Sequence, residues 1–516
     1  MHDTGSLEKI LVLDFGAQYA HLICRRIREL GVYAELVPFD VTPDEIRTRH
    51  ARGLILSGGP MSVYDDGAPL PDPSIYSIGI PILGICYGLQ AMVHQNGGKI
   101  RRSNKREYGK AELKPETDSP LFAGVQQKTV CWMSHGDAAE SIPEGFQSVA
   151  STQNSKYAAI SSNSLYAVQF HPEVTQTDEG MRMLSNFVFN ICRCEKNWTT
   201  SKMIEEQVSE LRSRIGPKER VLCALSGGID SATTAELLQR AIGDRLYCVF
   251  VDNGLLRKDE RNQIEVAFRP KLGRNLIVAD ESRRFLSKLR GVRDPEKKRK
   301  IVGREFIRAF SDVSRKIGNV KWLAQGTLYT DIVESAAGAS KHQSRIKSHH
   351  NVGGLPKKLR FKLVEPLKDL YKDEVRKVAE ALGLPKELVF THPFPGPGLS
   401  VRIIGEVTKD KLRICRDASY IVEEELRTAG LHESVWQAYA AVGDDLATGV
   451  LGDLRKVGHI VIIRIVESKE AMTADWARTP YPILERMSSR ITNEVSGVTW
   501  VTYAISSKPP STIEPQ

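Results

Sequence analysis

Short apolar runs alternate with helix-like stretches in two separate parts of this chain, and this alternation constrains the fold more than any other feature. Between residues 9 and 191, apolar runs such as 10–13, 53–56 and 81–85 are separated by stretches with helical periodicity such as 19–30. The alternation restarts at Val221. Apolar runs separated by amphipathic helices predict α/β domains, in which helices connect the strands of a largely parallel sheet.

Length and the placement of Pro and Gly divide the chain into three predicted domains. At 516 residues the chain is too long for one hydrophobic core. The run 392–398 has so many Pro and Gly residues that neither a helix nor a sheet ladder can continue through it. We expect a multidomain α/β protein with α/β domains at 1–196 and 197–395 and a small α+β domain at 396–516. The last domain has strand candidates at 459–466 and 499–505 and helix candidates at 412–428 and 482–494.

Composition argues against several classes of protein. The formal net charge is +9, but charged residues of both signs make up 26% of the chain, as on an ordinary soluble surface, so we expect no nucleic-acid partner. Eight cysteines in so long a chain do not form a disulfide framework, and Cys192 with Cys194 lacks the second pair that a structural zinc site needs. No signal-peptide pattern or long apolar stretch is present. We therefore expect a cytoplasmic protein with no membrane partner.

A glycine- and serine-rich string at 226–231 lies between the apolar run 221–225 and a helical stretch. Paired glycines let the backbone approach an anion, and serine hydroxyls and the N–H groups of a helix N-terminus can hold phosphate oxygens. Asp230 can hold a magnesium ion. The string lacks the Gly-Lys-Ser/Thr ending of a Walker loop. It resembles the PP-loop of ATP pyrophosphatases, which cleave ATP to AMP and pyrophosphate; the alternative is an ordinary turn between a strand and a helix.

Two positions outside the string also suit a nucleotide. Val251 lies near the end of the next apolar run, and parallel sheets bind ligands beyond the carboxyl ends of their strands. Lys372 could contact pyrophosphate, although an exposed lysine at the start of a helix fits the same pattern. The predicted ATP-binding residues are Ser226, Gly227, Gly228, Ile229, Asp230, Ser231, Ala232, Val251 and Lys372.

Cys86 follows a buried apolar run and stands among small residues, which predicts a nucleophile elbow. A sharp strand-to-helix turn exposes the sulfur, and the helix N-terminus favours the thiolate over the thiol. Downstream, His171 could take the proton of the cysteine and Glu173 could orient the imidazole. Taken singly, a buried cysteine and a hydrogen-bonded histidine are ordinary core residues. The N–H groups predicted to stabilise an oxyanion belong to Gly58, Gly59 and Tyr87.

This first part of the chain resembles class I glutamine amidotransferases. The resemblance implies that Cys86, His171 and Glu173 form a catalytic triad, that the cysteine attacks the side-chain amide of glutamine, and that a glutamyl thioester forms as ammonia is released. An ATP pyrophosphatase domain fits this chemistry, because adenylation turns a carbonyl oxygen into a leaving group that ammonia can displace. The resemblance is carried by the segments 13–16, 84–90, 106–109, 133–137 and 169–173.

The rest of the chain resembles the glutamine-hydrolysing GMP synthase family, through the segments 325–329, 347–356, 392–398 and 506–514. This resemblance implies that xanthosine monophosphate (XMP), ATP, magnesium and glutamine are converted to GMP, AMP, pyrophosphate and glutamate through adenylyl-XMP. It also implies that the last domain binds XMP and forms a homodimer. The expected XMP contacts are Arg402, Gln437, Lys508, Thr512, Ile513 and Glu514, and the expected lid residues are Lys347, His349 and His350.

Two segments have other interpretations. The paired histidines of the lid could bind zinc, but no cysteine or carboxylate stands beside them at ligand spacing. The charged run 293–300 could be a nucleic-acid patch, but we interpret it as a solvated helix face, since no aromatic residues are interleaved for stacking on bases. The chain also departs from the family, which usually ends in Glu-Trp-Glu where this chain has Glu514, Pro515 and Gln516.

Two rival functions remain open on the sequence alone. One is a PP-loop amidotransferase that acts on a different adenylated acceptor. The other is a non-catalytic nucleotide sensor built from the same folds, although Cys86, His171, Glu173 and Asp230 are all present.

Overall fold

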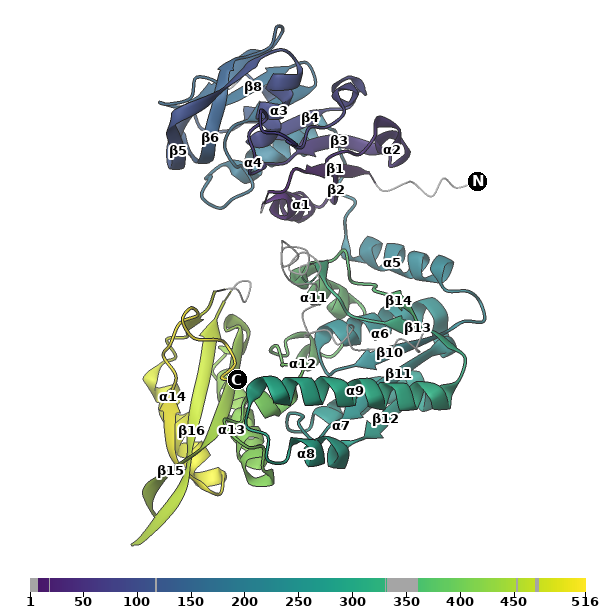
Figure 1. Cartoon of the computed structure of the whole chain (residues 1–516), viewed down its shortest axis with the longest axis vertical. Coiled ribbons are helices and arrows are strands. Elements are labelled where there is room, and N and C mark those ends of the chain that lie inside the picture. The colour runs from purple at the N-terminus through teal and green to yellow at the C-terminus, as the bar shows by residue number, and fades with distance from the viewer. Residues whose placement is uncertain are drawn as a thin grey trace. The chain divides into compact units, whose positions relative to one another are not determined.

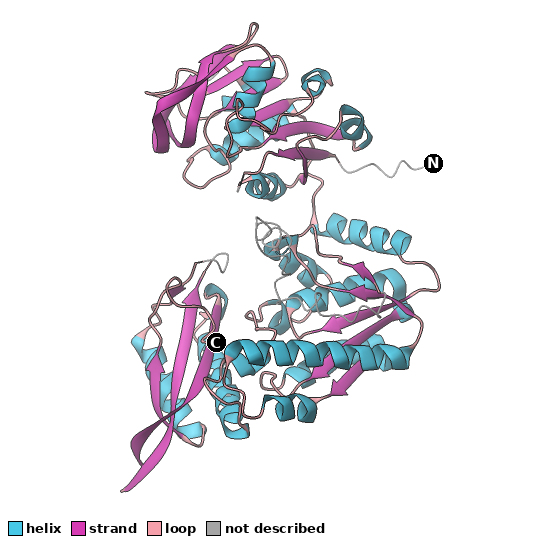
Figure 2. Ribbon diagram, in the orientation of Figure 1, coloured by secondary structure: helices cyan, strands magenta, loops and turns pink. Residues whose placement is uncertain are grey.

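The chain folds into two compact units, Met1–Lys202 and Met203–Gln516. The predicted division at 395/396 is not tested by these units and stays a prediction. Figures 1 and 2 show the computed structural model. It describes residues 8–17, 19–116, 118–329, 331, 361–451, 453–468 and 473–516, without the side chains of 102–106 and 451.

In the described part of the first unit, nine strands form a sheet in the order β2-β1-β3-β4-β9-β8-β7-β5-β6. The strands from β2 to β9 in this order are parallel to one another, and β8 turns back antiparallel to β9. The strands are β1 (Lys9–Asp14), β2 (Tyr33–Pro38), β3 (Ala51–Leu56), β4 (Ile82–Ile85), β5 (Lys99–Pro115), β6 (Thr129–Ser141), β7 (Gln147–Ser151), β8 (Ala159–Ser162) and β9 (Leu165–Val168).

Each face of this sheet has its own apolar core. Ile10 and Val12 of β1 belong to one core and Leu11 and Leu13 to the other, because successive side chains of a strand point to opposite faces. Helix α1 packs into the first core and α3 into the second, which explains why β1 is apolar along its length. The helices are α1 (Ala20–Glu29), α2 (Pro43–Thr48), α3 (Tyr87–Gln95), α4 (Gly180–Ser185), the 3-10 helices η1 (Pro73–Ser77) and η2 (Pro120–Phe122), and the π-helix η3 (Asn186–Ile191).

The second unit contains a parallel sheet in the order β12-β11-β10-β13-β14. The chain builds outward from β10 to β12 and then returns to the other side of β10, so the direction of winding reverses between β10 and β13. The strands are β10 (Arg220–Leu225), β11 (Leu246–Asp252), β12 (Leu276–Asp280), β13 (Val320–Ala324) and β14 (Lys362–Val364). The associated helices are α5 (Thr200–Arg214), α6 (Ile229–Ile242), α7 (Glu260–Leu272), α8 (Ser282–Leu289), α9 (Pro295–Ile317), α11 (Lys372–Ala381), α12 (Lys386–Val389), η4 (Gly243–Arg245) and η5 (Gly273–Asn275).

The same unit also contains a second, smaller sheet. A long antiparallel hairpin of β15 and β16 pairs with β17 and, in parallel, with β18 (Figure 2). One apolar core contains Leu222 of β10 and Val249 of β11 together with Val461 of β16 and Met487 of α14, so the two sheets share it. The elements are β15 (Gln437–Leu451), β16 (Leu454–Glu467), β17 (Asp475–Trp476), β18 (Val498–Tyr503), α13 (Lys409–Thr428), α14 (Tyr481–Glu494), η8 (Gly398–Val401) and η9 (His432–Ser434).

The predicted α/β class is confirmed, and the predicted strands and helices are present within a few residues of their expected ends. Among the described helices, none has the length and apolar character needed to cross a membrane.

The interpretation of 293–300 as a solvated helix face is wrong for one residue. The segment does begin a helix, α9, and Lys297 and Lys300 are exposed. Lys298, however, is 0% exposed. The local charge pattern failed here because burial of Lys298 depends on segments about a hundred or more residues later in the chain, Ser400 to Ile403 and Gln516.

Candidate active sites

The predicted nucleophile, Cys86, lies at a tight turn between β4 and α3. It is the residue before the first turn of α3, with φ of 53° and ψ of −102°, a conformation that L-residues rarely adopt. The turn requires glycine on both sides, since a Cβ on Gly88 would lie 2.3 Å from Leu56 O and one on Gly84 would lie 2.7 Å from Gly88 C. These contacts confirm the predicted elbow geometry.

Three neighbouring strands bring the rest of the first site together. β3, β4 and β9 are adjacent and parallel, so their carboxyl ends meet at one edge of the sheet. β3 leads into Gly58, β4 into Cys86 and β9 into His171. The strand order therefore assembles residues that lie far apart in the sequence.

His171 and Glu173 form a buried pair beside the sulfur. Nδ1 of His171 lies 2.7 Å from Oε1 of Glu173, and the two residues are 4% and 1% exposed. Burial alone lowers the pKa of His171, but the Glu173 carboxylate and the hydrogen bond with Cys86 outweigh it and raise the pKa to about 11. The imidazole therefore holds a proton readily in this position, as a base for the Cys86 thiol must.

The predicted oxyanion donors lie next to this pair. A Cβ on Gly58 would lie 3.3 Å from Cε1 of His171 and 3.8 Å from the Cβ of Cys86, and one on Gly59 would lie 3.0 Å from the ring of Tyr87. Within the described residues, the backbone N–H groups of Gly58, Gly59 and Tyr87 donate to no backbone carbonyl. No backbone acceptor among the described residues therefore competes with the oxyanion role predicted for these groups.

The sequence assigned no individual role to several polar groups that surround Cys86. Nε2 of Gln169 donates to Sγ of Cys86 at 3.7 Å, and Sγ lies 3.8 Å from the carbonyl oxygen of Ser134. Nε2 of His135 lies 3.4 Å from Glu107, and burial lowers the pKa of His135 despite that carboxylate. All four residues fall in segments that carry the amidotransferase resemblance, which was the signal available in the sequence.

The phosphate-loop string forms a closed turn between β10 and α6. Gly227 has φ of 78°, and Gly228 is the residue before the first turn of α6. The hydroxyl of Ser231 donates to Gly228 O at 2.9 Å and accepts from the N–H of Ser226 at 3.1 Å. This turn places the N-terminus of a helix directly after a parallel strand, which is the arrangement that binds phosphate.

The loop lies where the winding of the sheet reverses. A Cβ on Gly326, which follows β13, would lie 2.9 Å from the backbone carbon of Asp230, so segment 325–329 packs directly against the start of α6. Ligands of open α/β sheets bind in the crevice at such a reversal. The structure therefore brings together two motifs that the sequence identified separately.

Asp230 is paired with Lys372. Nζ of Lys372, at the start of α11, lies 2.7 and 2.8 Å from the two carboxylate oxygens of Asp230. Ile229 and Ala232 at the start of α6 and Val251 near the end of β11 have buried side chains, so these side chains are not available to ATP.

The residues at the loop fit magnesium only as a metal held largely by ATP. In the described part of the chain there is no group of three His, Cys, Asp or Glu side chains that could hold a metal. Asp230 is the one acidic side chain of the string, and both of its oxygens bond Lys372. Magnesium does bind proteins through one or two carboxylates together with substrate phosphates, so Asp230 suits that limited role.

Four of the predicted XMP contacts lie in one hydrogen-bonded cluster, in which Arg402 and Gln437 are buried. Nε and one terminal nitrogen of Arg402 donate to both oxygens of Glu514, at 3.1 and 3.0 Å, and Arg402 is 1% exposed. Nε2 of Gln437 donates to Glu514 at 2.7 Å, and the carbonyl oxygen of Ile513 accepts from the hydroxyl of Tyr439 at 2.6 Å. The charges of Arg402 and Glu514 are thus paired with each other.

The other two predicted XMP contacts lie in the same C-terminal segment, and the hydroxyl of Thr512 donates to the backbone oxygen of Glu514. The carbonyl oxygen of Thr512 accepts from Arg464 at 3.2 Å. The backbone of Lys508 pairs with Ala474, where its N–H donates to Ala474 O at 2.7 Å. The lid residues Lys347, His349 and His350 lie outside the described residues.

Comparison with known proteins agrees with these sites. The class-I glutamine amidotransferase family matches residues 11–191, and the GMP synthase C terminal domain family matches residues 424–515. The chain is 52% identical to the GMP synthase (glutamine-hydrolyzing) of Aquifex aeolicus over 98% of this chain and 99% of that protein. It is 51% identical to the protein of the same name from Heliobacterium modesticaldum, again over 98% and 99%. Identity at this level over nearly the full length of both chains shows that this chain belongs to the glutamine-hydrolyzing GMP synthase family.

Proposed function

We propose that this chain aminates XMP to GMP with ammonia taken from glutamine, at the expense of ATP, and that it does so in the cytoplasm. The observation that carries the proposal is the Cys86, His171 and Glu173 arrangement at a strand end, in a chain that also carries the phosphate loop at 226–231. The first site supplies a nucleophile, and the second supplies a place for the nucleotide that activates the acceptor.

In the first reaction, Cys86 attacks the side-chain amide carbon of glutamine and His171 takes the thiol proton. The N–H groups near Gly58 and Tyr87 stabilise the oxyanion of the tetrahedral intermediate. The imidazolium then donates a proton to the leaving nitrogen, so that ammonia departs and a thioester remains. Glu173 keeps the imidazole of His171 oriented during both proton transfers by its 2.7 Å contact with Nδ1. Water hydrolyses the thioester to glutamate.

In the second reaction, the oxygen at position 2 of XMP attacks the α-phosphate of ATP, and pyrophosphate leaves. The loop at 226–231 and Lys372 hold the pyrophosphate portion through N–H groups, hydroxyls and an ammonium group. Magnesium, when bound, neutralises part of the phosphate charge, and Asp230 is the side chain that would hold it. Ammonia then attacks the activated carbon, and AMP leaves as GMP forms.

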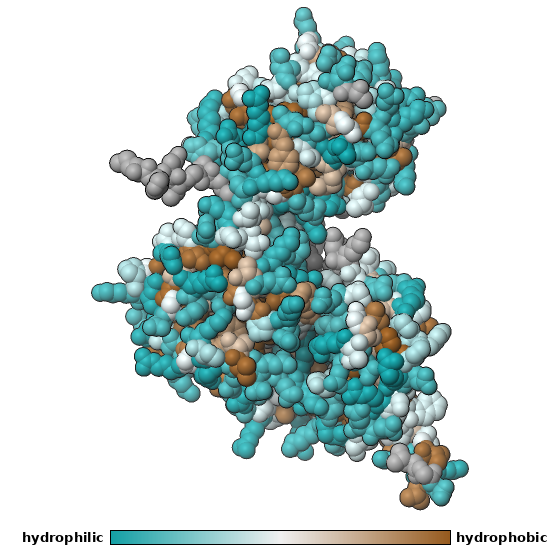
Figure 3. Space-filling view, turned by 180° about the vertical axis from the view of Figure 1, so that it is seen from behind, coloured by the Kyte–Doolittle hydropathy of each residue, from teal (hydrophilic) through white to brown (hydrophobic). Residues whose placement is uncertain are grey.

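A homodimer is the second part of the proposal, and it rests on an exposed apolar surface. The hairpin of β15 and β16 exposes Leu446, Val450, Leu454 and Val457, which are 56–76% exposed. In Figure 3, brown atoms mark the far end of this hairpin at the lower right. Leu446, Val450 and Val457 share one face of the hairpin and Leu454 lies on the other, since Val450 pairs with Arg455 and Leu451 with Leu454. Exposed apolar side chains gathered on a hairpin indicate an interaction surface, and a second copy of this chain is the partner we propose.

Separating the two half-reactions tests the proposal. Cys86→Ala should abolish GMP formation from glutamine while amination of XMP continues with external ammonium. Asp230→Ala should abolish synthesis with either nitrogen source. Loss of both activities in Cys86→Ala, with the protein folded, would contradict the division of labour, and normal synthesis by Asp230→Ala would contradict its role at the phosphates.

The rival functions predict different products. Purified protein is incubated with glutamine, ATP and XMP, or with glutamine, ATP and other carbonyl acceptors, and AMP release is measured. AMP formation with XMP but with no other acceptor supports the proposal. AMP formation with a different acceptor supports another amidotransferase, and no AMP formation with any acceptor supports a nucleotide sensor.

A further inference from the structure

We propose that Lys298 is a positioning residue of the acceptor site, which holds together the two segments that carry Arg402 and Glu514. The inference rests on the proposed function, because it concerns the pocket that we assign to XMP. Lys298 itself lies on α9 and outside the set of residues that the sequence predicted to touch a nucleotide.

All three protons of the Lys298 ammonium group have an acceptor. Nζ lies 2.7 Å from Ile403 O, 3.1 Å from Ser400 O and 2.6 Å from Oε1 of Gln516. An ammonium group has three donors, so this set satisfies it completely. No donor is left for solvent, which agrees with the 0% exposure of the residue.

The acceptors of Lys298 flank the predicted XMP contacts. Ser400 and Ile403 lie on either side of Arg402, and Gln516 lies two residues after Glu514. Arg402 and Glu514 also bond each other directly. Lys298 and the Arg402–Glu514 pair therefore link the same two segments, 400–403 and 514–516, by two separate sets of hydrogen bonds. Lys298 therefore fixes the distance between the two sides of the pocket.

The neighbour of Lys298 on the same helix adds to this hold. A terminal nitrogen of Arg299 donates to Gln516 O at 2.6 Å. Two consecutive residues of α9 therefore contact the end of the same C-terminal segment, 504–516. That segment has no regular helix or strand between Ala504 and Ser507, so its position depends on such contacts.

The charge of Lys298 is not required for packing. Burial, with the Lys411 charge and against Asp444, lowers the pKa of Lys298 to about 8. The charged groups that act on it are Lys411 and Asp444; Asp444 bonds Lys411 and lies 3.6 Å from Arg293. An apolar side chain at this position would avoid the desolvation cost of an ammonium group. The presence of a lysine therefore indicates that the three hydrogen bonds of its ammonium group position the segments that accept them.

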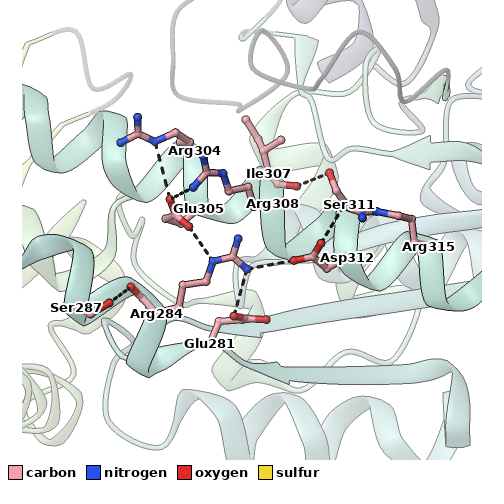
Figure 4. A network of polar contacts seen from close by, with 10 residues as sticks. All are labelled: Glu281, Arg284, Ser287, Arg304, Glu305, Ile307, Arg308, Ser311, Asp312 and Arg315. Carbon is pink, nitrogen blue, oxygen red and sulfur yellow. Dashed lines mark hydrogen bonds and ion pairs between the residues drawn. The ribbon is translucent and has the colours of Figure 1, made fainter.

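The helix that carries Lys298 is itself held in place. Glu305, seven residues further along α9 and 1% exposed, accepts from Arg284 of α8 at 2.8 Å and from Arg308 at 2.9 Å. Figure 4 shows this network of α8 and α9. Lys298 therefore projects from a fixed support, as a positioning residue needs to.

The first test compares Lys298→Met with matched variants of its exposed neighbours, Lys297→Met and Lys300→Met. With external ammonium as nitrogen source, Lys298→Met should raise the KM for XMP roughly tenfold, since a buried hydrogen-bond set is lost, with kcat changed less than about threefold. The two neighbours should match the wild type. An unchanged KM for XMP in Lys298→Met would overturn the proposal.

If Lys298→Met loses stability, a double-mutant cycle of Lys298→Met and Gln516→Ala still tests whether the two residues act through one contact. Gln516→Ala removes one acceptor without touching the core, and it should raise the KM for XMP by a smaller factor. The double variant should be no worse than Lys298→Met alone, because both changes break the same contact. Effects that multiply independently would overturn the proposal.

A readout without substrate separates this inference from the proposed function. Hydrogen–deuterium exchange of the segment 504–516, measured without nucleotide, should become faster in Lys298→Met and stay unchanged in Lys297→Met. If wild-type protein releases no AMP with XMP, the proposed function fails while this result still stands. Unchanged exchange in Lys298→Met would refute the positioning role whatever the protein catalyses.

Discussion

At the scale of single residues, two left-handed backbone conformations mark the two sites. Cys86 has φ of 53° and Gly227 has φ of 78°. For a residue with a side chain this region costs roughly 1–2 kcal/mol, so Cys86 is held there by its surroundings, whereas Gly227 adopts it freely. Strain that persists at a strand end agrees with a functional role for Cys86.

Gly227 should tolerate no side chain. A Cβ there would lie 2.1 Å from Oε1 of Glu260, a buried group, and the residue would keep its positive φ. We expect Gly227→Ala to lower the free energy of unfolding of the second unit by roughly 2 kcal/mol or more, measured by urea denaturation, and to abolish AMP formation. Gly228→Ala is the matched control, since its nearest contact would be 3.5 Å. Equal loss of stability in both variants would refute the explanation.

The pair of His171 and Glu173 should give the first unit a pH-dependent stability. The pKa of His171 rises from 6.5 to about 11, because Glu173 and Cys86 outweigh burial. A raised pKa contributes stability that is fully present below pH 6.5 and is lost progressively as the pH rises toward 11. The melting temperature of wild type should therefore exceed that of Glu173→Gln most near pH 6.5 and less at pH about 9. A difference that grows with pH would contradict this account.

At the scale of helices and strands, each site depends on where parallel strands end. β3, β4 and β9 lead into the first site, and β10 and β13 lead into the second. Helix α9 has a different role, because it connects the region of α8 with the C-terminal segment through charged side chains along its length. Its sequence shows the charges but not which of them are buried.

Glu305 should be the residue on which the position of α9 depends most. Its side chain is 2% exposed and contacts Arg284, Arg304 and Arg308 (Figure 4). Glu305→Gln should lower the free energy of unfolding of the second unit by roughly 2–3 kcal/mol, because the hydrogen bonds of charged arginines to a buried carboxylate are lost. Asp312→Asn, whose side chain is 44% exposed, should cost less than about 1 kcal/mol. Comparable losses in both variants, measured by urea denaturation, would contradict the importance of burial.

At the scale of the whole molecule, the second unit is one compact unit because a single apolar core joins its two sheets. Residues of the phosphate-loop sheet and of the β15–β16 sheet share one apolar core, whereas the first unit has cores of its own. The cluster of Arg402 and Glu514, which we propose binds the acceptor, lies beside that shared core, since Ile403 belongs to it. The phosphate loop and the proposed acceptor site therefore lie within one folded unit.

The proposed dimer makes a prediction at this scale. Charges on the exposed hairpin, introduced as Val450→Asp with Leu454→Asp, should halve the molar mass of the particle in sedimentation analysis, because each side chain is more than 70% exposed and apolar. Tyr481→Asp, at an 87% exposed position on α14, should leave the mass unchanged. A double variant that keeps the wild-type mass would place any dimer interface elsewhere.

The sequence by itself determined where the residues of both candidate sites lie relative to the strands. Cys86, the pair His171 and Glu173, and the string 226–231 each stand directly after a short apolar run, and strand ends are set by local periodicity. Because parallel strands end at a common edge, predicting that these residues lie at the ligand-binding edge of a sheet required only the fold class. The lid at 347–356 could be named from the sequence but lies outside the described residues.

Only the tertiary structure decided which charged groups meet. Lys372 pairs with Asp230 across 142 residues, Arg402 with Glu514 across 112, and Lys298 with Gln516 across 218. Local patterns report the neighbours of a residue along a helix or strand, so they predicted Lys298 to be solvated. Its burial is created by segments that arrive from elsewhere in the chain, and no periodicity within 293–300 carries that information.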